Sequence, residues 1–322
     1  MQRKLIEVAY EITYMCNLRC SHCYNSQELS HREELTTEQS KKALKELHDF
    51  GATKLKIGGG EPLLREDFFE IYSYAKNIGY EVNFSTNGLL VLESMDKLMK
   101  NRVDKLQISI DNLGEKHDKI RNKKGLVEIV EKTIDELRDV NMKISIATTL
   151  TKDNYKDLDD ILKFCREKEV YRWRVMKYIP NGLDDKLLLS KEEYKNAVIK
   201  LLEMKSQCDI KPEIIVAREF DLIKTPMDYN DMQCFGGKTM LSLKPDGDVT
   251  PCSYIHHITC GNITKDSIGK IWGSKEMACY ATDCYDVSCE HAEKCRGGCK
   301  SASYFMTGKF GCDPYCWVKK ES

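Results

Sequence analysis

The fifteen cysteines are spread unevenly along the 322 residues, and this distribution constrains the fold more than any other feature. Three lie between Cys16 and Cys23, only Cys165 and Cys208 lie in the long middle stretch, and ten lie between Cys234 and Cys316. We expect the cysteine-poor stretch to form its own apolar core. The cysteine-dense C-terminal third has only short apolar runs, so it is expected to need metal to hold its shape.

The sequence has no apolar signal segment and no apolar run of membrane-spanning length. We therefore expect a cytoplasmic protein, in which cysteines serve as metal or redox ligands before they form disulfides. The odd number of cysteines also argues against a fully paired disulfide framework. The formal net charge of −1 gives no indication of a surface that binds nucleic acid or a membrane.

Strand-like and helix-like segments alternate between residue 7 and about residue 205. Six strands in this order predict right-handed βαβ crossovers and a parallel sheet, and the periodicity leaves open whether that sheet closes. We expect an N-terminal domain at residues 1–208, a linker at residues 209–231 and a cysteine-rich domain at residues 232–322. The expected strands are residues 8–13, 54–57, 81–85, 105–110, 143–149 and 172–178.

The first three cysteines, Cys16, Cys20 and Cys23, have the spacing C-x3-C-x2-C on the loop that leaves the first expected strand. Three thiolates this close can hold one face of a cubane cluster and leave its fourth iron open to a chelating substrate. The alternative is a structural zinc loop with a distant fourth ligand. Zinc sites usually use C-x2-C pairs and close all four positions, which disfavours that alternative.

This loop resembles the cluster motif of the radical S-adenosylmethionine (SAM) family. The resemblance implies a partial (β/α)6 barrel of TIM type, with Cys16, Cys20 and Cys23 holding a 4Fe–4S cluster whose fourth iron binds SAM. It implies that His22 takes the aromatic position that contacts the adenine. Reaction sites on such barrels lie at the C-terminal ends of the strands, where this loop is expected.

Further motifs are similar to SAM-binding segments of that family. Gly59-Gly60-Glu61-Pro62 resembles the GGEP turn that meets the SAM amino group, although alone it would be read as a tight turn. The remaining SAM contacts that the resemblance implies are Ser85 and Asn87 after the third strand, Ser109 and Asp111 after the fourth, and Arg121 in the segment His117-Asp118-x-x-Arg121. Helix capping is the alternative role for Ser109 and Asp111.

The C-terminal cysteines resemble the SPASM extension of radical SAM enzymes, which holds auxiliary iron–sulfur clusters. The matching features are Cys234-x12-Gly247-x4-Cys252, Cys289-x5-Cys295-x3-Cys299 and a last cysteine. The resemblance implies one or two auxiliary 4Fe–4S clusters: Cys234, Cys252 and Cys299 at the first, and Cys289, Cys295 and Cys316 at the second. A pair of zinc knuckles is the alternative.

The sequence departs from the SPASM pattern at two places. Asp286 stands where a cysteine is expected before Cys289, so either Cys284 or Asp286 supplies that ligand. Cys312 and Cys316 both suit the last position. Cys165 and Cys208 are expected to be packing residues, and Cys260, Cys279 and Cys312 are more easily explained as small buried side chains than as hydrogen-atom donors.

The resemblance implies an oxidoreductase that cleaves SAM reductively and abstracts hydrogen from a substrate through a 5′-deoxyadenosyl radical. It implies a low-potential electron donor such as flavodoxin or ferredoxin. The favoured substrate is a ribosomally made peptide, with recognition of its leader left to a separate binding protein or to the barrel. Alternatives are a haem-type cofactor, because Tyr178–Gly182 resembles haem-tailoring relatives, sulfatase maturation, and a non-catalytic zinc module. Arg172, Arg174 and Lys177 on the sixth expected strand could meet an acidic substrate or could equally form a solvated edge.

Overall fold

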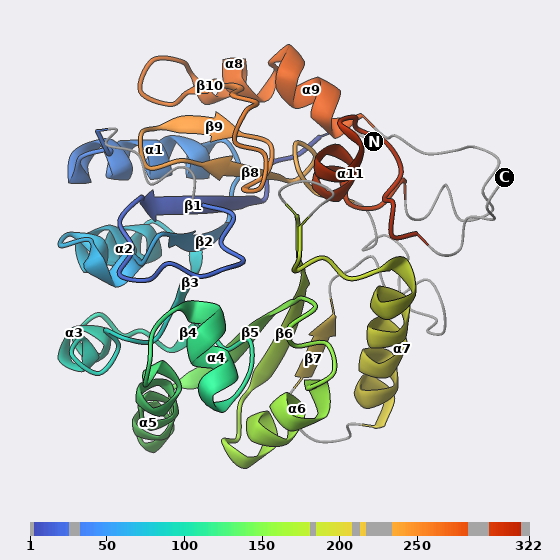
Figure 1. The fold of residues 1–322 in the computed structure, drawn as a ribbon. Coiled ribbons are helices and arrows are strands. Elements are labelled where there is room, and N and C mark those ends of the chain that lie inside the picture. The colour runs from blue at the N-terminus through green and yellow to red at the C-terminus, as the bar shows by residue number, and fades with distance from the viewer. Residues whose placement is uncertain are drawn as a thin grey trace, which may run out of the picture. The chain divides into compact units, whose positions relative to one another are not determined.

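The structure is a computed structural model that describes residues 3–25, 33–180, 185–207, 213–216, 234–282 and 296–316 (Figure 1). It divides into two compact units, which we describe separately. The first unit contains residues 1–108, 129–142 and 235–282, and the second contains residues 109–128, 143–234 and 283–322. Both units combine segments from the N-terminal two thirds and the C-terminal third of the chain. The predicted domain boundaries at residues 208 and 232 stay a prediction.

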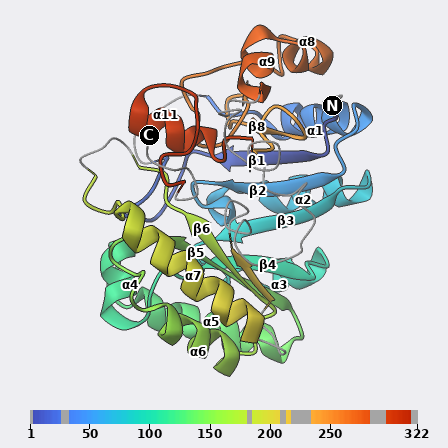
Figure 2. The same cartoon turned by 90° about the vertical axis from the view of Figure 1, so that its right-hand side faces the viewer.

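The first unit is built on a mainly parallel sheet. In this sheet β1 pairs with β2 and β2 with β3 in parallel, and β3 pairs with β4 (Figures 1 and 2). Its N-terminal elements are β1 (Glu7–Thr13), α1 (Thr37–Asp49), β2 (Lys54–Gly59), η1 (Pro62–Leu64), α2 (Phe68–Asn77), β3 (Glu81–Thr86), α3 (Met95–Lys100) and β4 (Lys105–Ser109). Helix α5 (Leu126–Asp139) is shared between the two units.

The C-terminal third adds strands to the same sheet. Strand β8 (Met240–Leu243) pairs in parallel with β1, with Glu7 opposite Met240, and β9 (Asp248–Thr250) and β10 (Gly261–Asn262) continue in antiparallel order. Two short helices follow, α8 (Ile268–Trp272) and α9 (Lys275–Ala281). The sequence indicated neither these strands nor these helices, because each is too short to show a clear period.

The second unit contains a parallel set of three strands. Strand β5 (Lys143–Leu150) pairs with β6 (Arg172–Lys177), and β6 pairs with β7 (Glu213–Val216). Among the described residues, its helices are α4 (Gly114–Arg121), α6 (Leu158–Glu167), α7 (Lys191–Gln207) and α11 (Lys300–Thr307), and α7 contacts β7 (Figure 2). The α/β fold with a parallel sheet is confirmed. No helix among the described residues has the length and apolar character needed to cross a membrane.

The strands of the first unit have one apolar and one polar face. Val8, Tyr10 and Ile12 of β1 are fully buried, and the Tyr10 hydroxyl lies 2.8 Å from the Ser40 hydroxyl of α1. On β3, Phe84 contacts Phe68 of α2, with ring centroids 5.0 Å apart. Helices therefore cover this face, and each fully buried leucine or phenylalanine stabilises the packing by about 1.5–3 kcal/mol.

The opposite face of these strands carries polar side chains. Because successive side chains of a strand point to opposite faces, Glu11 of β1, Lys56 of β2 and Asn83 of β3 lie away from the helices. A parallel sheet covered by helices on both faces would show nearly continuous apolar runs instead. The polar face is therefore the one that can meet a hydrophilic ligand.

Candidate active site

The loop after β1 carries the three predicted cluster ligands. Cys16, Cys20 and Cys23 are each partly buried. The buried Leu18 anchors the loop, and the Arg19 guanidinium donates to the carbonyls of Cys16 at 2.9 Å and Leu18 at 2.8 Å. The Cys23 amide donates to the Cys20 carbonyl at 3.3 Å. These hydrogen bonds hold residues 16–23 in one compact loop, which carries all three thiols.

The chemistry of this loop suits an iron–sulfur cluster. The Cys16 Sγ accepts a bond from the Leu18 amide at 3.4 Å, while burial raises the pKa of the Cys16 thiol. A buried thiolate of this kind is stabilised when it binds a metal. Among the described residues, no three or more His, Cys, Asp or Glu side chains gather closely enough to hold one metal ion. The C-x3-C-x2-C set supplies three thiolates and leaves a fourth position open, which suits a cluster better than a zinc site that closes all four positions.

The turn Gly59-Gly60-Glu61-Pro62 packs directly against the chain that leaves β1. The Gly60 amide donates to the Thr13 carbonyl at 2.8 Å, and the Glu61 amide donates to the Met15 carbonyl at 2.7 Å. A Cβ on Gly60 would lie 1.9 Å from the Met15 oxygen. Gly59 has φ +114, and a Cβ there would lie 2.7 Å from the Thr13 oxygen. Both glycines are therefore needed for this close approach, which goes beyond an ordinary tight turn.

The Glu61 carboxylate joins the turns after β2 and β3. Its side chain is fully buried and accepts bonds from the Thr86 hydroxyl at 2.8 Å, the Asn87 amide at 2.8 Å and the Leu63 amide at 3.2 Å. These three donors are neutral, so they fix the carboxylate without cancelling its charge. A buried carboxylate held this way suits a cationic group such as a ligand amine.

Asparagine side chains link these turns to the cysteine loop. Asn87 donates to the Asn17 side chain at 2.8 Å, and Asn25 donates to the Gly59 carbonyl at 3.4 Å. The structure thus brings together the predicted contacts Gly59, Gly60, Glu61 and Asn87 around the loop of Cys16. His22 on that loop is half-buried. Ser85 is also half-buried and accepts a bond from Gln107 at 2.9 Å.

The other predicted SAM contacts belong to the second unit. The Asp111 carboxylate is buried, pairs with the Arg121 guanidinium at 2.6 Å and accepts the Thr149 amide at 2.9 Å. The Asp111 amide donates to His117 Nδ1 at 3.2 Å. Helix α4 has Leu113 at its N-cap with no side-chain capping bond, so neither Ser109 nor Asp111 caps it. Asp111 and Arg121 form a fixed ion pair at the end of the fourth strand.

Part of the predicted auxiliary-cluster set lies in the described residues. The described members are each partly buried: Cys234, Cys252, Cys299, Cys312 and Cys316. The Cys299 Sγ accepts the Ala302 amide at 3.5 Å and caps the N-terminus of α11, a position that favours a thiolate. The remaining predicted ligands Cys284, Asp286, Cys289 and Cys295 lie outside the described residues, as does Cys208.

Three other cysteines were expected to be small buried side chains or packing residues. Cys165 is fully buried and its pKa is raised by burial, so it is confirmed as a packing residue. Burial likewise raises the pKa of Cys260 to about 11. Cys279 is exposed, so its predicted burial was wrong, because the short helix α9 turns this residue to the surface.

Lys177 does not have the role that the sequence suggested. The sequence left open whether it meets an acidic substrate or forms a solvated edge, but its side chain is only 4% exposed and forms an ion pair with Asp313. The alternation along β6 could not reveal a partner 136 residues away. A similar pair between Glu11 and Lys244 in the first unit was missed altogether. The only signal was that charged residues stand among apolar strand residues.

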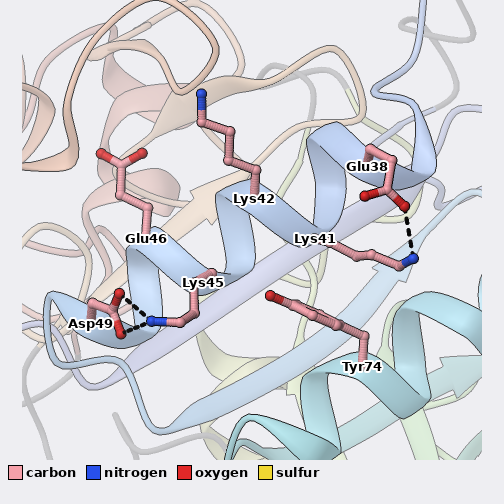
Figure 3. Close-up of a pocket in the computed structure, with 7 residues that line it drawn as sticks. All are labelled: Glu38, Lys41, Lys42, Lys45, Glu46, Asp49 and Tyr74. Carbon is pink, nitrogen blue, oxygen red and sulfur yellow. Dashed lines mark hydrogen bonds and ion pairs between the residues drawn. The ribbon is translucent and has the colours of Figure 1, made fainter.

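A shallow charged recess lies on the surface of α1 and α2 (Figure 3). It encloses about 440 Å³, and its lysines pair with neighbouring acids: Lys41 with Glu38 at 2.8 Å and Lys45 with Asp49 at 2.5 Å. None of its lining residues belongs to the cysteine loop. Such pairs are typical of a solvated helix surface, and we assign the recess no ligand.

These features define a class of protein: an α/β enzyme with a cysteine loop at the end of its first parallel strand. Comparison with family models identifies the family. Residues 10–165 match the radical SAM superfamily, and residues 234–300 match the iron–sulfur cluster-binding SPASM domain. The chain belongs to the radical SAM superfamily and is an enzyme with a SPASM extension. This membership implies SAM and 4Fe–4S clusters as cofactors.

Individual relatives match nearly the whole chain. The chain is 28% identical to the AdoMet-dependent heme synthase of Nitratidesulfovibrio vulgaris over 97% of this chain and 92% of that protein. It is 27% identical to the mycofactocin maturase MftC of Mycobacterium tuberculosis over 96% and 82% of the two chains. The structure of Streptococcus suis SuiB bound to S-adenosylmethionine has a TM-score of 0.79 and 16% identity over 98% and 78%, a likeness of fold.

Proposed function

We propose that this radical SAM enzyme oxidises carboxylate-bearing side chains of an iron tetrapyrrole. The observation that carries the proposal is the match to the heme synthase of N. vulgaris, which spans 97% of this chain and 92% of that protein. A relative from Methanosarcina barkeri with the same name is 29% identical over 96% and 95% of the two chains.

The cofactor and the chain would divide the work. A cluster held by Cys16, Cys20 and Cys23, with SAM on its open iron, supplies hydrogen abstraction. Glu61 would orient the SAM amino group, because its carboxylate is fixed by three neutral donors. Gly59 and Gly60 would let the backbone approach the ligand closely. A flavodoxin-type or ferredoxin-type donor would supply the electron for SAM cleavage. After hydrogen abstraction the substrate radical would lose CO2 and one electron, and an auxiliary cluster would accept that electron.

Recognition of the substrate carboxylates is proposed for Arg174 of β6, because Arg172 is the first residue of the strand and lies farther from the C-terminal end, where reaction sites lie. Arg172 and Arg174 alternate with the fully buried Trp173 and Val175, so both arginines lie on the opposite face of the strand. The Arg172 guanidinium lies over the Tyr171 ring at 5.2 Å. A planar guanidinium matches a carboxylate through two parallel hydrogen bonds, which suits the propionate groups of a porphyrin.

The test uses anaerobically purified protein with dithionite, SAM and iron coproporphyrin. We expect substrate-dependent release of 5′-deoxyadenosine and a porphyrin product that has lost carboxylate groups, measured by chromatography and mass spectrometry. Replacing all three of Cys16, Cys20 and Cys23 with Ala should abolish release while leaving auxiliary iron bound. Colourless protein with stoichiometric zinc would instead support a non-catalytic module and contradict the proposal.

The arginines provide a sharper test of substrate class. Arg174→Met should weaken porphyrin binding by about 10- to 100-fold, because hydrogen bonds to charged groups contribute about 1.5–3 kcal/mol. The control is Arg166→Met on the exposed surface of α6, which should leave binding unchanged. Equal binding of the porphyrin tetramethyl ester, which has no carboxylates, would contradict the assignment.

A second candidate is maturation of a ribosomally made peptide, the substrate class that the sequence favoured. It is supported by the similarity to the mycofactocin maturase over 96% of this chain. Such a substrate would call for leader recognition by the barrel or by a separate binding protein. Modification of a peptide encoded beside the gene, with no turnover of the porphyrin, would favour this function over the first.

A further inference from the structure

A buried ion pair joins the end of β6 to the C-terminal cysteine segment in the second unit. Lys177 Nζ contacts the Asp313 carboxylate, and the two side chains are only 4% and 7% exposed. Lys177 is the last residue of β6, and Asp313 follows Cys312 directly. A lysine is rarely buried to this extent unless its charge is paired.

Two tyrosine rings enclose the ammonium group. Lys177 Nζ lies 4.5 Å from the ring centroid of Tyr315 and 5.0 Å from that of Tyr194 on α7. The two rings are 4.4 Å apart, and the Tyr315 hydroxyl donates to the Leu189 carbonyl at 3.0 Å. The rings attract the cation by their π faces and limit where it can move. The position of the Asp313 carboxylate is therefore fixed as well.

The fixed carboxylate reaches the predicted ligand Cys299. Asp313 Oδ2 accepts the Cys299 amide at 3.3 Å, and the Asp313 amide donates to the Gly297 carbonyl at 2.8 Å. Gly298 has φ +72, and a Cβ there would lie 3.0 Å from the Asp313 Cβ. The segment that leads into α11 therefore lies closely against Asp313. This contact fixes the backbone position of Cys299, the N-cap residue of α11.

We propose that Lys177 and Asp313 are positioning residues for an auxiliary iron–sulfur cluster and act by fixing the Cys299 backbone. A buried ion pair contributes little to stability compared with apolar side chains of similar size, so stability alone does not explain it. The hydrogen bond from the Cys299 amide to Asp313 gives the pair a positioning role instead. This inference goes beyond the proposed function, because it holds for any substrate of the enzyme.

The experiment isolates the auxiliary clusters in a background in which Cys16, Cys20 and Cys23 are replaced with Ala. Iron and sulfide per chain, the EPR spectrum after dithionite reduction and the melting temperature are measured on anaerobically purified protein. The test variant is Lys177→Met with Asp313→Leu, which removes both charges and avoids an unpaired buried carboxylate. The control is Lys116→Met with Asp157→Leu, a more exposed pair of the same unit with 2.8 Å between its charged atoms.

The proposal predicts a specific loss of cluster. The test variant should retain about half of the background's iron or less, with a changed EPR spectrum, whereas the iron-free forms of the two proteins should have the same melting temperature. Lys177→Met with Asp313→Asn should recover part of the iron, because the asparagine oxygen can still accept the Cys299 amide. The control variant should keep all of its iron. Unchanged iron and EPR in the test variant, equal loss in the control, or a background that binds no iron would each overturn the proposal.

Discussion

Each of the two units contains one buried lysine–carboxylate pair between an early strand and the cysteine-rich third, and the two pairs are built differently. In the first unit the acid, Glu11, is on β1 and the lysine, Lys244, follows β8, with 2.6 Å between the charged atoms. In the second unit the lysine, Lys177, is on β6 and the acid, Asp313, is in the C-terminal segment. The acid is thus on the early strand in the first unit, whereas the lysine is on the early strand in the second unit.

The surroundings of the two ammonium groups differ more than their positions. Lys244 Nζ contacts the His256 Nδ1 at 2.7 Å and the Ser253 carbonyl at 3.3 Å, next to Cys252. Lys177 lies between tyrosine rings instead. A buried cation can thus be stabilised by directional hydrogen bonds or by broad π faces. The stabilisation of Lys244 therefore depends on individual hydrogen-bonding atoms, whereas that of Lys177 depends on the faces of the tyrosine rings.

The largest effect is expected when one pair is left half-made. Lys244→Met removes the partner of the buried Glu11 carboxylate and should lower the free energy of unfolding by about 3–5 kcal/mol. Lys244→Met with Glu11→Leu should recover most of that loss. Anaerobic chemical denaturation measures both losses. The control is Lys45→Met in the exposed pair with Asp49, which should lower the free energy of unfolding by about 0–1 kcal/mol. A loss below about 1 kcal/mol in the single variant would contradict the buried-charge account.

Intermediate effects are expected from the rings around Lys177. Tyr194→Leu removes one π face from the ammonium and should cost about 2 kcal/mol of unfolding free energy. Tyr315→Phe keeps the ring and removes only the hydroxyl bond to the Leu189 carbonyl, so it should cost about 1 kcal/mol. If Tyr315→Phe is the more damaging of the two in the same denaturation experiment, the π-face description of this pair is wrong.

The smallest effect concerns pH and separates the two pairs. Burial, with Lys244 nearby, lowers the pKa of His256 to about 3, whereas an unfolded histidine titrates near 6.5. The unfolded state therefore binds the proton first, and the stability from His256 is present above about pH 6.5 and lost as the pH falls toward 3. The slope from this residue is at most about 1.4 kcal/mol per pH unit.

His256→Asn isolates that contribution, because the asparagine oxygen can accept from Lys244 without titrating. Between pH 7 and 5.5 the wild-type protein should lose about 1 kcal/mol more unfolding free energy than this variant. Asp313→Asn serves as the comparison for the other pair, whose residues include no histidine. Identical pH dependence in the wild-type protein and His256→Asn would argue that His256 does not titrate on unfolding.

Sequence patterns predicted the features that depend on neighbouring residues. The C-x3-C-x2-C motif is such a local signal, and the structure has a loop there after β1. The capping box of α1, in which Thr36 and Gln39 bond reciprocally, is an equally local feature that the structure shows. The serine caps of α8 and α9, Ser267 and Ser274, are also local signals, but the two helices are too short to show a clear apolar period and were not predicted. The residue spacing alone did not predict which turns approach the cysteine loop. That prediction came from the family resemblance.

Features that depend on distant partners were not predictable. The placement of β8 beside β1 pairs residues more than two hundred positions apart, as Glu7 opposite Met240. The burial of Lys177 depends in the same way on Asp313. Helix α4 was missed for another reason: its sequence Gly114–Arg121 is rich in charge and has only a weak apolar face.

The parallel docking of β8 has a consequence for any attempt to shorten the chain. Without residues after 234, β1 would present its unpaired amides and carbonyls to solvent, and Glu11 would lose its counter-ion. Bare strand edges recruit other copies of the same chain. A fragment that keeps only the radical-forming half should therefore aggregate rather than survive as a minimal catalyst.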